Sequence, residues 1–325
     1  MRFRAGIPVV SALAAVLSGA CSKPSFDKGE HDHPPIPDTA EAPLKKPIEL
    51  VDVDAPRGFA IDDAYVYWFE SASLKKTPIG LGEATTLADD VEPGQGPVVA
   101  GNYLYWARPE GRAVRILAVA KSGGPPTKVA LTDPTVRDLA GDAQGLWWLG
   151  YPDSSGADAP HDARLLHVAG PGEPVQTIAP RLKDPHDLAT DGAELYWTST
   201  SGAVIQHVSK KGGAPLAVDA TAFWSPAIAV TGRWVYWLSQ GDVMRVAKTG
   251  GASSVAVHEG DPPVALGGDP TGACWVTKDG EVKILADDSA TPRTIARDES
   301  HVVQVASNGR TVIWETKSSI RMVPK

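Results

Sequence analysis

Two short polar segments carry side chains that could bind a metal ion or a polar ligand. Arg137 precedes Asp138 in the first segment, and His186 precedes Asp187 in the second. Imidazole nitrogens and carboxylate oxygens are ligands of divalent cations in proteins. If the fold brings Asp138, His186 and Asp187 together, they could hold a divalent cation for a metal-dependent hydrolase or lyase. Alternatively, the carboxylates bond loop amides or pair with Arg57 and Arg137, and no cofactor is needed.

The sequence lacks the common signatures of enzymes. It contains no G-x-S-x-G nucleophile motif, no phosphate-binding loop, no Rossmann glycine pattern and no H-E-x-x-H zinc motif. The formal net charge of -8 disfavours nucleic acid as a partner, because an acidic surface repels phosphate. We therefore expect a binding or scaffold protein rather than an enzyme, with the metal-dependent hydrolase or lyase as the alternative function.

The elements that would position these residues belong to a repeat that occurs seven times. Each copy has a short apolar segment, a tight turn and a second apolar segment that ends in a Tyr-Trp or similar pair, as in residues 187–198. The tryptophans that mark the copies are Trp68, Trp106, Trp148, Trp197, Trp237, Trp275 and Trp314. A period of about 40 residues with several short strands in each repeat is typical of a β-propeller.

The second half of the repeat supplies two more strands. Residues 118–124, 207–213 and 246–251 each end in a Gly-Gly pair, which provides the positive φ that a tight hairpin turn requires. An apolar segment follows each pair. With four strands in each copy, the sequence predicts an all-β, seven-bladed propeller, with six or eight blades as alternatives if one of the marks is not a blade.

The two ends of the chain suggest how the ring closes. Residues 47–51 form one strand before the first repeat, and a single strand, residues 319–323, follows Trp314. We expect the N-terminal strand to complete the last blade, because this leaves no open edge in the ring. The propeller is then expected to span residues 48–325.

The Tyr-Trp pairs resemble those of the YWTD-type propellers of lipoprotein receptors and of related bacterial propeller lipoproteins. Tyr196-Trp197-Thr198 matches three letters of the four-letter motif, and Ser199 replaces its Asp. The resemblance covers residues 48–325. It implies a recognition surface rather than catalysis.

Propellers usually bind ligands at the central entrance, where loops lead into the innermost strands. The candidate ligand-binding residues at this entrance are Arg57, Arg137, Asp138, His161, His186, Asp187, Trp224 and His301. His161 belongs to an enlarged segment, residues 150–164, in the third repeat. Trp224 could be a stacking platform for a sugar or peptide, or a lid packed on the fifth blade. We expect a protein or saccharide ligand at the cell envelope.

Residues 1–21 have the features of an export signal. Arg2 and Arg4 precede an apolar stretch, residues 5–17, that is short for a membrane span. The stretch leads into Leu-Ser-Gly-Ala-Cys, which resembles a bacterial lipobox, and this resemblance implies that Cys21 becomes lipidated.

Residues 22–47 are rich in proline and charge, which predicts a disordered linker. Together with the signal, this linker predicts an exported protein that is lipid-anchored to the cell envelope and contacts the membrane through its anchor. Ser22, rather than Asp, follows the lipidated Cys and favours the outer membrane. A secreted or periplasmic soluble protein is the alternative.

Overall fold

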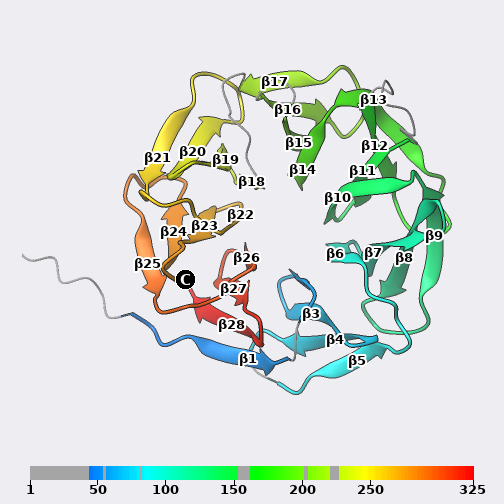
Figure 1. The fold of residues 1–325 in the computed structure, drawn as a ribbon, viewed down its shortest axis with the longest axis horizontal. Helices are drawn as coiled ribbons and strands as arrows, with labels where there is room; N and C mark the ends of the chain where they lie inside the picture. Colours follow the sequence, from blue (N-terminus) through cyan, green and yellow to red (C-terminus); the bar gives the residue numbers. More distant parts are fainter. Residues whose placement is uncertain (1–43, 54–55, 81, 153–161, 201–203, 220–226) are drawn as a thin grey trace, which may run out of the picture. The chain divides into compact units, whose positions relative to one another are not determined.

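A computed structural model describes residues 44–325, except 54–55, 81, 153–161, 201–203 and 220–226. The described chain contains 28 strands in seven four-stranded antiparallel sheets. Figure 1 shows these sheets as the blades of a ring. The predicted seven-bladed β-propeller is therefore confirmed. The described ranges contain no helix that is long and apolar enough to cross a membrane.

The blades are numbered here in chain order, and each is given from its inner to its outer strand. Blade 1 comprises β2 (Phe59–Ile61), β3 (Tyr65–Glu70), β4 (Ser73–Pro78) and β5 (Thr85–Ala88), and blade 2 comprises β6 (Gln95–Ala100), β7 (Tyr103–Glu110), β8 (Ala113–Ala120) and β9 (Thr127–Thr132). Blade 3 comprises β10 (Thr135–Asp142), β11 (Gly145–Tyr151), β12 (Asp162–Val168) and β13 (Gln176–Lys183), and blade 4 comprises β14 (Pro185–Thr190), β15 (Glu194–Ser199), β16 (Val204–Ser209) and β17 (Leu216–Asp219). Blade 5 comprises β18 (Ile228–Val230), β19 (Trp234–Ser239), β20 (Asp242–Ala247) and β21 (Ser254–His258), and blade 6 comprises β22 (Ala265–Asp269), β23 (Gly272–Val276), β24 (Val282–Ala286) and β25 (Arg293–Ala296). Blade 7 comprises β26 (Gln304–Ser307), β27 (Thr311–Glu315), β28 (Ser319–Pro324) and β1 (Ile48–Asp52).

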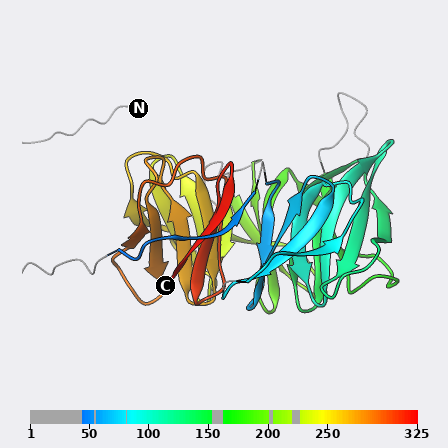
Figure 2. The same ribbon diagram turned by 90° about the horizontal axis from the view of Figure 1, so that it is seen from below.

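Blade 7 joins the two ends of the propeller. β1 pairs antiparallel with β28, with Ile48 opposite Met322 and Asp52 opposite Ser319. Figure 2 shows β1, in blue, running beside β28, in red. The predicted closure by an N-terminal strand in the last blade is confirmed, and it ties residues near both ends of the chain into one sheet.

The Tyr-Trp pair lies on the second strand of each blade and packs the blades together. At each boundary, the Trp of one blade lies in a buried cluster with the residue at the Tyr position of the preceding blade, as Trp106 does with Tyr67. Cys274 occupies the Tyr position of blade 6 and is buried in the cluster of Trp314. Burying a side chain of this size contributes about 2–3 kcal/mol. The repeat that marks the sequence is thus a packing repeat.

The two faces of the ring carry different chain connections. On the upper face, the outer strand of one blade leads into the inner strand of the next, as at Asp184 between β13 and β14. On the lower face, the inner strand turns into the second strand, as at Asp191 between β14 and β15.

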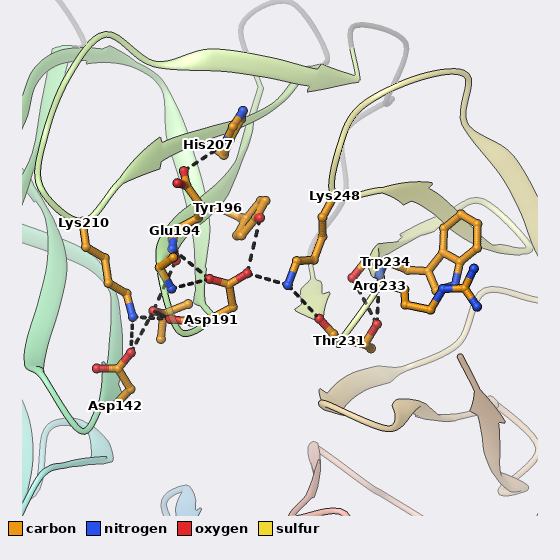
Figure 3. A network of polar contacts seen from close by, with 12 residues as sticks. Asp142, Asp191, Glu194, Tyr196, His207, Lys210, Thr231, Arg233, Trp234 and Lys248 are labelled. Carbon is orange, nitrogen blue, oxygen red and sulfur yellow. Dashed lines mark hydrogen bonds and ion pairs between the residues drawn. The ribbon is translucent and has the colours of Figure 1, made fainter. Parts of the chain in front are cut away.

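Aspartates in the lower-face turns connect neighbouring blades (Figure 3). Oδ1 of Asp191 accepts hydrogen bonds from the amides of Ala193 and Glu194, both at 2.8 Å, and so closes its own hairpin. Oδ2 of Asp191 lies 2.6 Å from Nζ of Lys248 in the next blade. One carboxylate therefore stabilises a turn with one oxygen and a blade boundary with the other.

The same ion pair occurs at three further boundaries. Asp62 in blade 1 pairs with Lys121 in blade 2 at 2.9 Å. The other two pairs are Asp142 with Lys210, and Asp269 with Lys325. Each lysine directly follows a third strand, so the pairing recurs with the period of the fold.

Candidate functional site

A hollow of about 250 Å³ opens on the upper face between blades 3 and 4. The described residues that line it are Thr135, Arg137, Tyr151, Asp184, His186 and Thr200. Two of the predicted ligand-binding residues, Arg137 and His186, therefore lie in one site although they come from different blades. Its lining is mostly polar, as expected of a site that recognises hydrogen-bonding groups.

Arg137 and His186 occupy β-bulges rather than the loops that we expected. The pairing of β10 with β11 shifts between Val136 and Leu139, and that of β14 with β15 shifts between Pro185 and Leu188. A bulge inserts extra residues into one strand and turns their side chains away from the regular alternation. The equivalent bulges of blades 3 and 4 thus direct both polar segments to the upper face.

The wall of the hollow is fixed by two hydrogen bonds between neighbouring segments. The Tyr151 hydroxyl donates to the Pro185 carbonyl oxygen at 2.7 Å, and the Thr200 amide donates to the Asp184 carbonyl oxygen at 3.1 Å. Asp184 has φ of 40°, in the left-handed region that non-glycine residues rarely adopt. Backbone strain of this kind is common at functional sites.

The guanidinium of Arg137 lies against the imidazole of His186, with Nη2 at 2.8 Å from Nδ1. The Arg137 carbonyl oxygen accepts a hydrogen bond from Nε2 of Gln95 in blade 2, also at 2.8 Å. Burial, and then the neighbouring Arg137 charge, lower the pKa of His186. His186 is therefore neutral at neutral pH, and Arg137 provides the positive charge of the lining.

Asp138 and Asp187 lie next to these residues on the two inner strands. Oδ1 of Asp138 accepts from the Leu139 amide at 2.8 Å, and Oδ2 accepts from the Leu188 amide of blade 4 at 2.7 Å. Burial raises the pKa of Asp138 to about 6 in spite of these bonds and the Arg137 charge. This carboxylate has a structural role at the boundary of blades 3 and 4.

Asp187 differs from Asp138 in its hydrogen bonding. Its Oδ2 atom is buried and has no hydrogen-bond partner among the described residues. Burial first, and then the charge of Asp138, raise the pKa of Asp187 to about 7, while Arg137 acts in the opposite direction. An unpartnered buried carboxylate oxygen is costly, which makes Asp187 the unusual member of the pair.

The described residues do not form the predicted metal centre. No three His, Cys, Asp or Glu side chains in the described ranges are grouped so that they could hold a metal ion. Nδ1 of His186 faces the Arg137 guanidinium, and both oxygens of Asp138 accept backbone amides. Within this part of the chain, the divalent cation and the metal-dependent hydrolase or lyase therefore gain no support.

The remaining candidates are not brought into this hollow. His301, with φ of 56°, lines a second upper-face hollow of about 360 Å³ at blade 7, together with Glu299 and Arg321. Arg57 is exposed before β2 and is not among the described residues that line either hollow. His161, Trp224 and the lipidation candidate Cys21 lie outside the described residues.

Thr135 and Thr200 line the hollow but were not expected from the sequence. Their signal was positional, since Thr135 begins β10 and Thr200 directly follows β15. A second signal lay in the register of the repeat. On each inner strand, one residue pairs with the marker Trp of the second strand. The residue just before it is Asp138 in blade 3, Asp187 in blade 4 and Gln304 in blade 7. Comparing the copies of the repeat at this position would have identified these polar residues.

No protein-family model matches the chain, and no curated protein matches it. Among solved structures, the chain is similar to YCF48 bound to D1 peptide, with a TM-score of 0.62, 12% identity, and coverage of 86% of this chain and 95% of that one. It is also similar to PorZ of Porphyromonas gingivalis, an essential bacterial surface component of the type-IX secretion system (TM-score 0.60, 14% identity, 86% and 38% coverage).

A further similar structure is the extracellular domain of the putative one-component system BT4673 of B. thetaiotaomicron, with a TM-score of 0.56, 11% identity, and coverage of 86% and 39%. The chain thus spans less than half the length of the PorZ and BT4673 chains. At these identities the likeness shows the fold alone. The class of protein defined by fold and repeat is a seven-bladed β-propeller whose second strands carry Tyr-Trp or similar pairs.

Proposed function

We propose that this chain is an exported, lipid-anchored β-propeller that binds a protein partner on its upper face, at the hollow between blades 3 and 4. The observation that carries the proposal is the bulged pair of inner strands, which brings Arg137 and His186 from separate blades into one polar hollow. Rigid scaffolds that present binding residues at their ends are a common solution for recognition.

The similar structures support an exported binding role. PorZ is described as a bacterial surface component, BT4673 contributes an extracellular domain, and YCF48 is described in complex with a peptide. These properties belong to those proteins. They support the proposal only by analogy of fold.

The anchor proposal rests on the lipobox resemblance at Cys21 and on the point where the chain reaches the ring. Nζ of Lys45 lies 3.4 Å from the carbonyl oxygens of Pro324 and Lys325. Lys325 also pairs with Asp269 in a lower-face turn. Within the described residues, Lys45 therefore lies beside the lower-face end of β28.

Membrane fractionation tests the anchor. Cys21→Ser should release the protein from the membrane fraction, because the thiol that accepts the lipid is removed, whereas the wild-type protein should remain attached. Release with detergent but not with salt is expected for the wild type. Continued membrane attachment of the Cys21→Ser protein would rule out lipidation at this residue.

Site-specific photo-crosslinking in the native cells tests the binding site. A crosslinking residue at Thr200, on the rim of the hollow, should give a discrete protein adduct. The matched control is Lys211, which is exposed in the lower-face turn of the same blade. Arg137→Glu should remove the Thr200 adduct. Equal adducts at both positions, or none at Thr200, would contradict the proposal, and a saccharide ligand would then have to be considered.

A further inference from the structure

On the basis of the proposed function, we propose that the partner is recognised through a single carboxylate, which binds Arg137, and that binding is accompanied by uptake of a proton by Asp187. The ligand chemistry follows from the charges of the hollow. The proton follows from the carboxylates of the two inner strands beneath it.

Arg137 determines the chemical class of the ligand. Its exposed guanidinium offers several N–H donors in one plane, a geometry that suits a carboxylate. Thr135 and Thr200 line the same hollow, and a threonine hydroxyl can donate a further hydrogen bond to a carboxylate. The Tyr151 hydroxyl already donates to Pro185, so its ring is held as a wall.

Asp184 limits the negative charge that the hollow can accept. Asp184 lines the same hollow as Arg137, and its charge acts on Tyr151 and His186 in that lining. A polyanion or a phosphate would bring two or more negative charges close to this acid, and like charges at short distance repel. One carboxylate with a polar neighbourhood, such as an acidic side chain of a peptide, is the ligand that both residues accommodate.

The proton uptake follows from the position of Arg137 beside two carboxyl groups. Its positive charge favours the ionised forms of Asp138 and Asp187. A ligand carboxylate on Arg137 offsets that charge, and the ionised pair then becomes less stable. Asp138 is committed to the Leu139 and Leu188 amides, whereas Oδ2 of Asp187 has no partner in the described chain. The proton from solvent therefore binds to Asp187.

Burial first, and then the Arg137 charge, lower the pKa of His186, which makes His186 the competing group for the proton. Both ring nitrogens of His186 face the Arg137 guanidinium, whereas Oδ2 of Asp187 has no partner in the described chain, so Asp187 is the favoured site. β10 contributes Arg137 and Asp138, β14 contributes the neutral His186, the segment before β14 contributes Asp184, and β11 contributes Tyr151. The flanking inner strands β6 and β18 contain no charged residue. Burial raises the pKa of Tyr151 to about 12, so it does not exchange a proton near neutral pH.

Calorimetric titration with two matched peptides tests the inference. The probe is a blocked pentapeptide with one central glutamate between glycines, and the control is the same peptide with glutamine. The glutamate peptide should bind more tightly by at least tenfold. Its affinity should fall as the pH rises above 7, by at most about tenfold per pH unit for one linked proton. Repeating the titration in buffers of different ionisation enthalpy should show uptake of a fraction of one proton per peptide.

Two variants separate the parts of the inference. Arg137→Gln should lose peptide binding at every pH. Asp187→Asn should keep it but lose both the pH dependence and the proton uptake, and its thermal unfolding confirms that it is folded. Binding by Asp187→Asn with an unchanged pH dependence would overturn the proton uptake. Equal binding of the two peptides, or no binding of either, would overturn the carboxylate ligand.

The outcomes that would overturn the carboxylate ligand or the proton uptake can be distinguished from those that would overturn the proposed binding site. If the Thr200 adduct forms and disappears in Arg137→Glu, but the glutamate peptide does not bind better than its control, the upper face binds a partner at Arg137 through a group other than a carboxylate. If no Thr200 adduct forms, the proposed binding site itself is wrong.

Discussion

The lower and upper faces of the propeller are built from the same repeat but use charged residues differently. On the lower face, four boundaries have an Asp six residues before the marker Trp, paired with a Lys that directly follows the third strand of the next blade. On the upper face, the position before the residue opposite the Trp holds Asp138 and Asp187 in adjacent blades and Gln304 in blade 7. The charged residues of the lower face therefore follow the repeat, whereas those of the upper face differ from blade to blade.

The three remaining lower-face boundaries show how strict the repetition is. Where the Asp position holds another residue, the Lys position of the next blade has changed too. Matched by strand register, the residues at these positions are Ala100 with Gly170, which lies two residues after β12, Thr231 with Asp287, and Asn308 with Ile79. In the second pair the carboxylate has moved to the other blade, and Asp287 accepts a bond from the Thr231 hydroxyl at 3.0 Å.

Joint replacement is what electrostatics requires at a partly buried boundary. A Lys or Asp that lost its partner would leave a charge without compensation, at a larger cost than the pair itself contributes. Among the described residues, Asp287 on the lower face has an unpartnered Oδ1 and accepts from the Thr231 hydroxyl and the Arg233 amide rather than from a lysine. On the upper face, Asp187 has an unpartnered Oδ2. An unpartnered buried carboxylate oxygen costs stability at both residues. What distinguishes Asp187 from Asp287 is its place next to His186, which lines the upper-face hollow.

The largest expected effect comes from breaking the lower-face pair whose lysine is the most deeply buried. The Lys210 side chain is 5% exposed, pairs with Asp142 and lies over the Trp147 ring at 4.7 Å from its centroid. Lys210→Ala should lower the free energy of unfolding by about 3 kcal/mol, because it leaves the Asp142 carboxylate unpaired and removes packing. Chemical denaturation measures the change.

The exposed neighbour Lys211 provides the control for Lys210→Ala. Lys211→Ala should change the free energy of unfolding by less than about 0.5 kcal/mol. Equal effects of the two substitutions would show that the lower-face pairs do not hold the blades together.

The next largest effect is expected at Asp187, where a substitution should raise the free energy of unfolding rather than lower it. Burial and the Asp138 charge raise the pKa of Asp187 to about 7 from an ordinary 3.8. Between these pH values the folded protein binds more protons than the unfolded chain, so stability falls as the pH rises from 4 to 7. Asp187→Asn should therefore stabilise the protein by about 2 kcal/mol at pH 8, as measured by denaturation.

The stabilisation by Asp187→Asn should shrink at pH 5, where the wild-type carboxyl group is already protonated. Asp138→Asn is the matched control. It should not stabilise the protein, because one of the amides of Leu139 and Leu188 would lose its acceptor. A destabilising effect of Asp187→Asn at pH 8 would contradict the proposed difference between the two aspartates.

The smallest expected effect comes from introducing the Asp-Lys ion pair at a lower-face boundary that lacks it. Asn308→Asp with Ile79→Lys would introduce the repeated ion pair at the boundary of blades 7 and 1. The pair should show a favourable coupling of about 0.5–1 kcal/mol in a double-mutant cycle, while each single change leaves a charge without its partner. A coupling near zero would show that the joint replacement seen at this boundary has no energetic basis.

The repeat made most of the fold predictable from the sequence. Trp68 to Trp314 recur with the period of one blade, and the turns between the strands use residues whose local preferences are strong, such as Asp191-Gly192 and the Gly-Gly pairs. Closure by residues 48–52 was predictable because the last repeat lacked a strand. These features follow from residues that are neighbours in the sequence and from the number of strands in each repeat. No contact between distant residues is needed to predict them.

The candidate site was predictable only in outline. The sequence placed Arg137 and His186 near one sector of the ring, and the structure puts both in one hollow. It also suggested a metal centre and included His301, but the guanidinium faces the imidazole and His301 lines a separate hollow. Which charges neutralise one another depends on distances between blades, and no local pattern encodes those distances.

The sequence by itself therefore determined the class of fold and the way the ring closes, and it favoured seven blades over six or eight, because short-range preferences and a period near 40 residues specify these features. Only the tertiary structure decided that Asp138 bonds the next blade while Asp187 keeps an unpartnered oxygen, since the two residues occupy the same position in the repeat. The difference arises from what the adjacent blade presents to each carboxylate, and that is a property of the assembled ring.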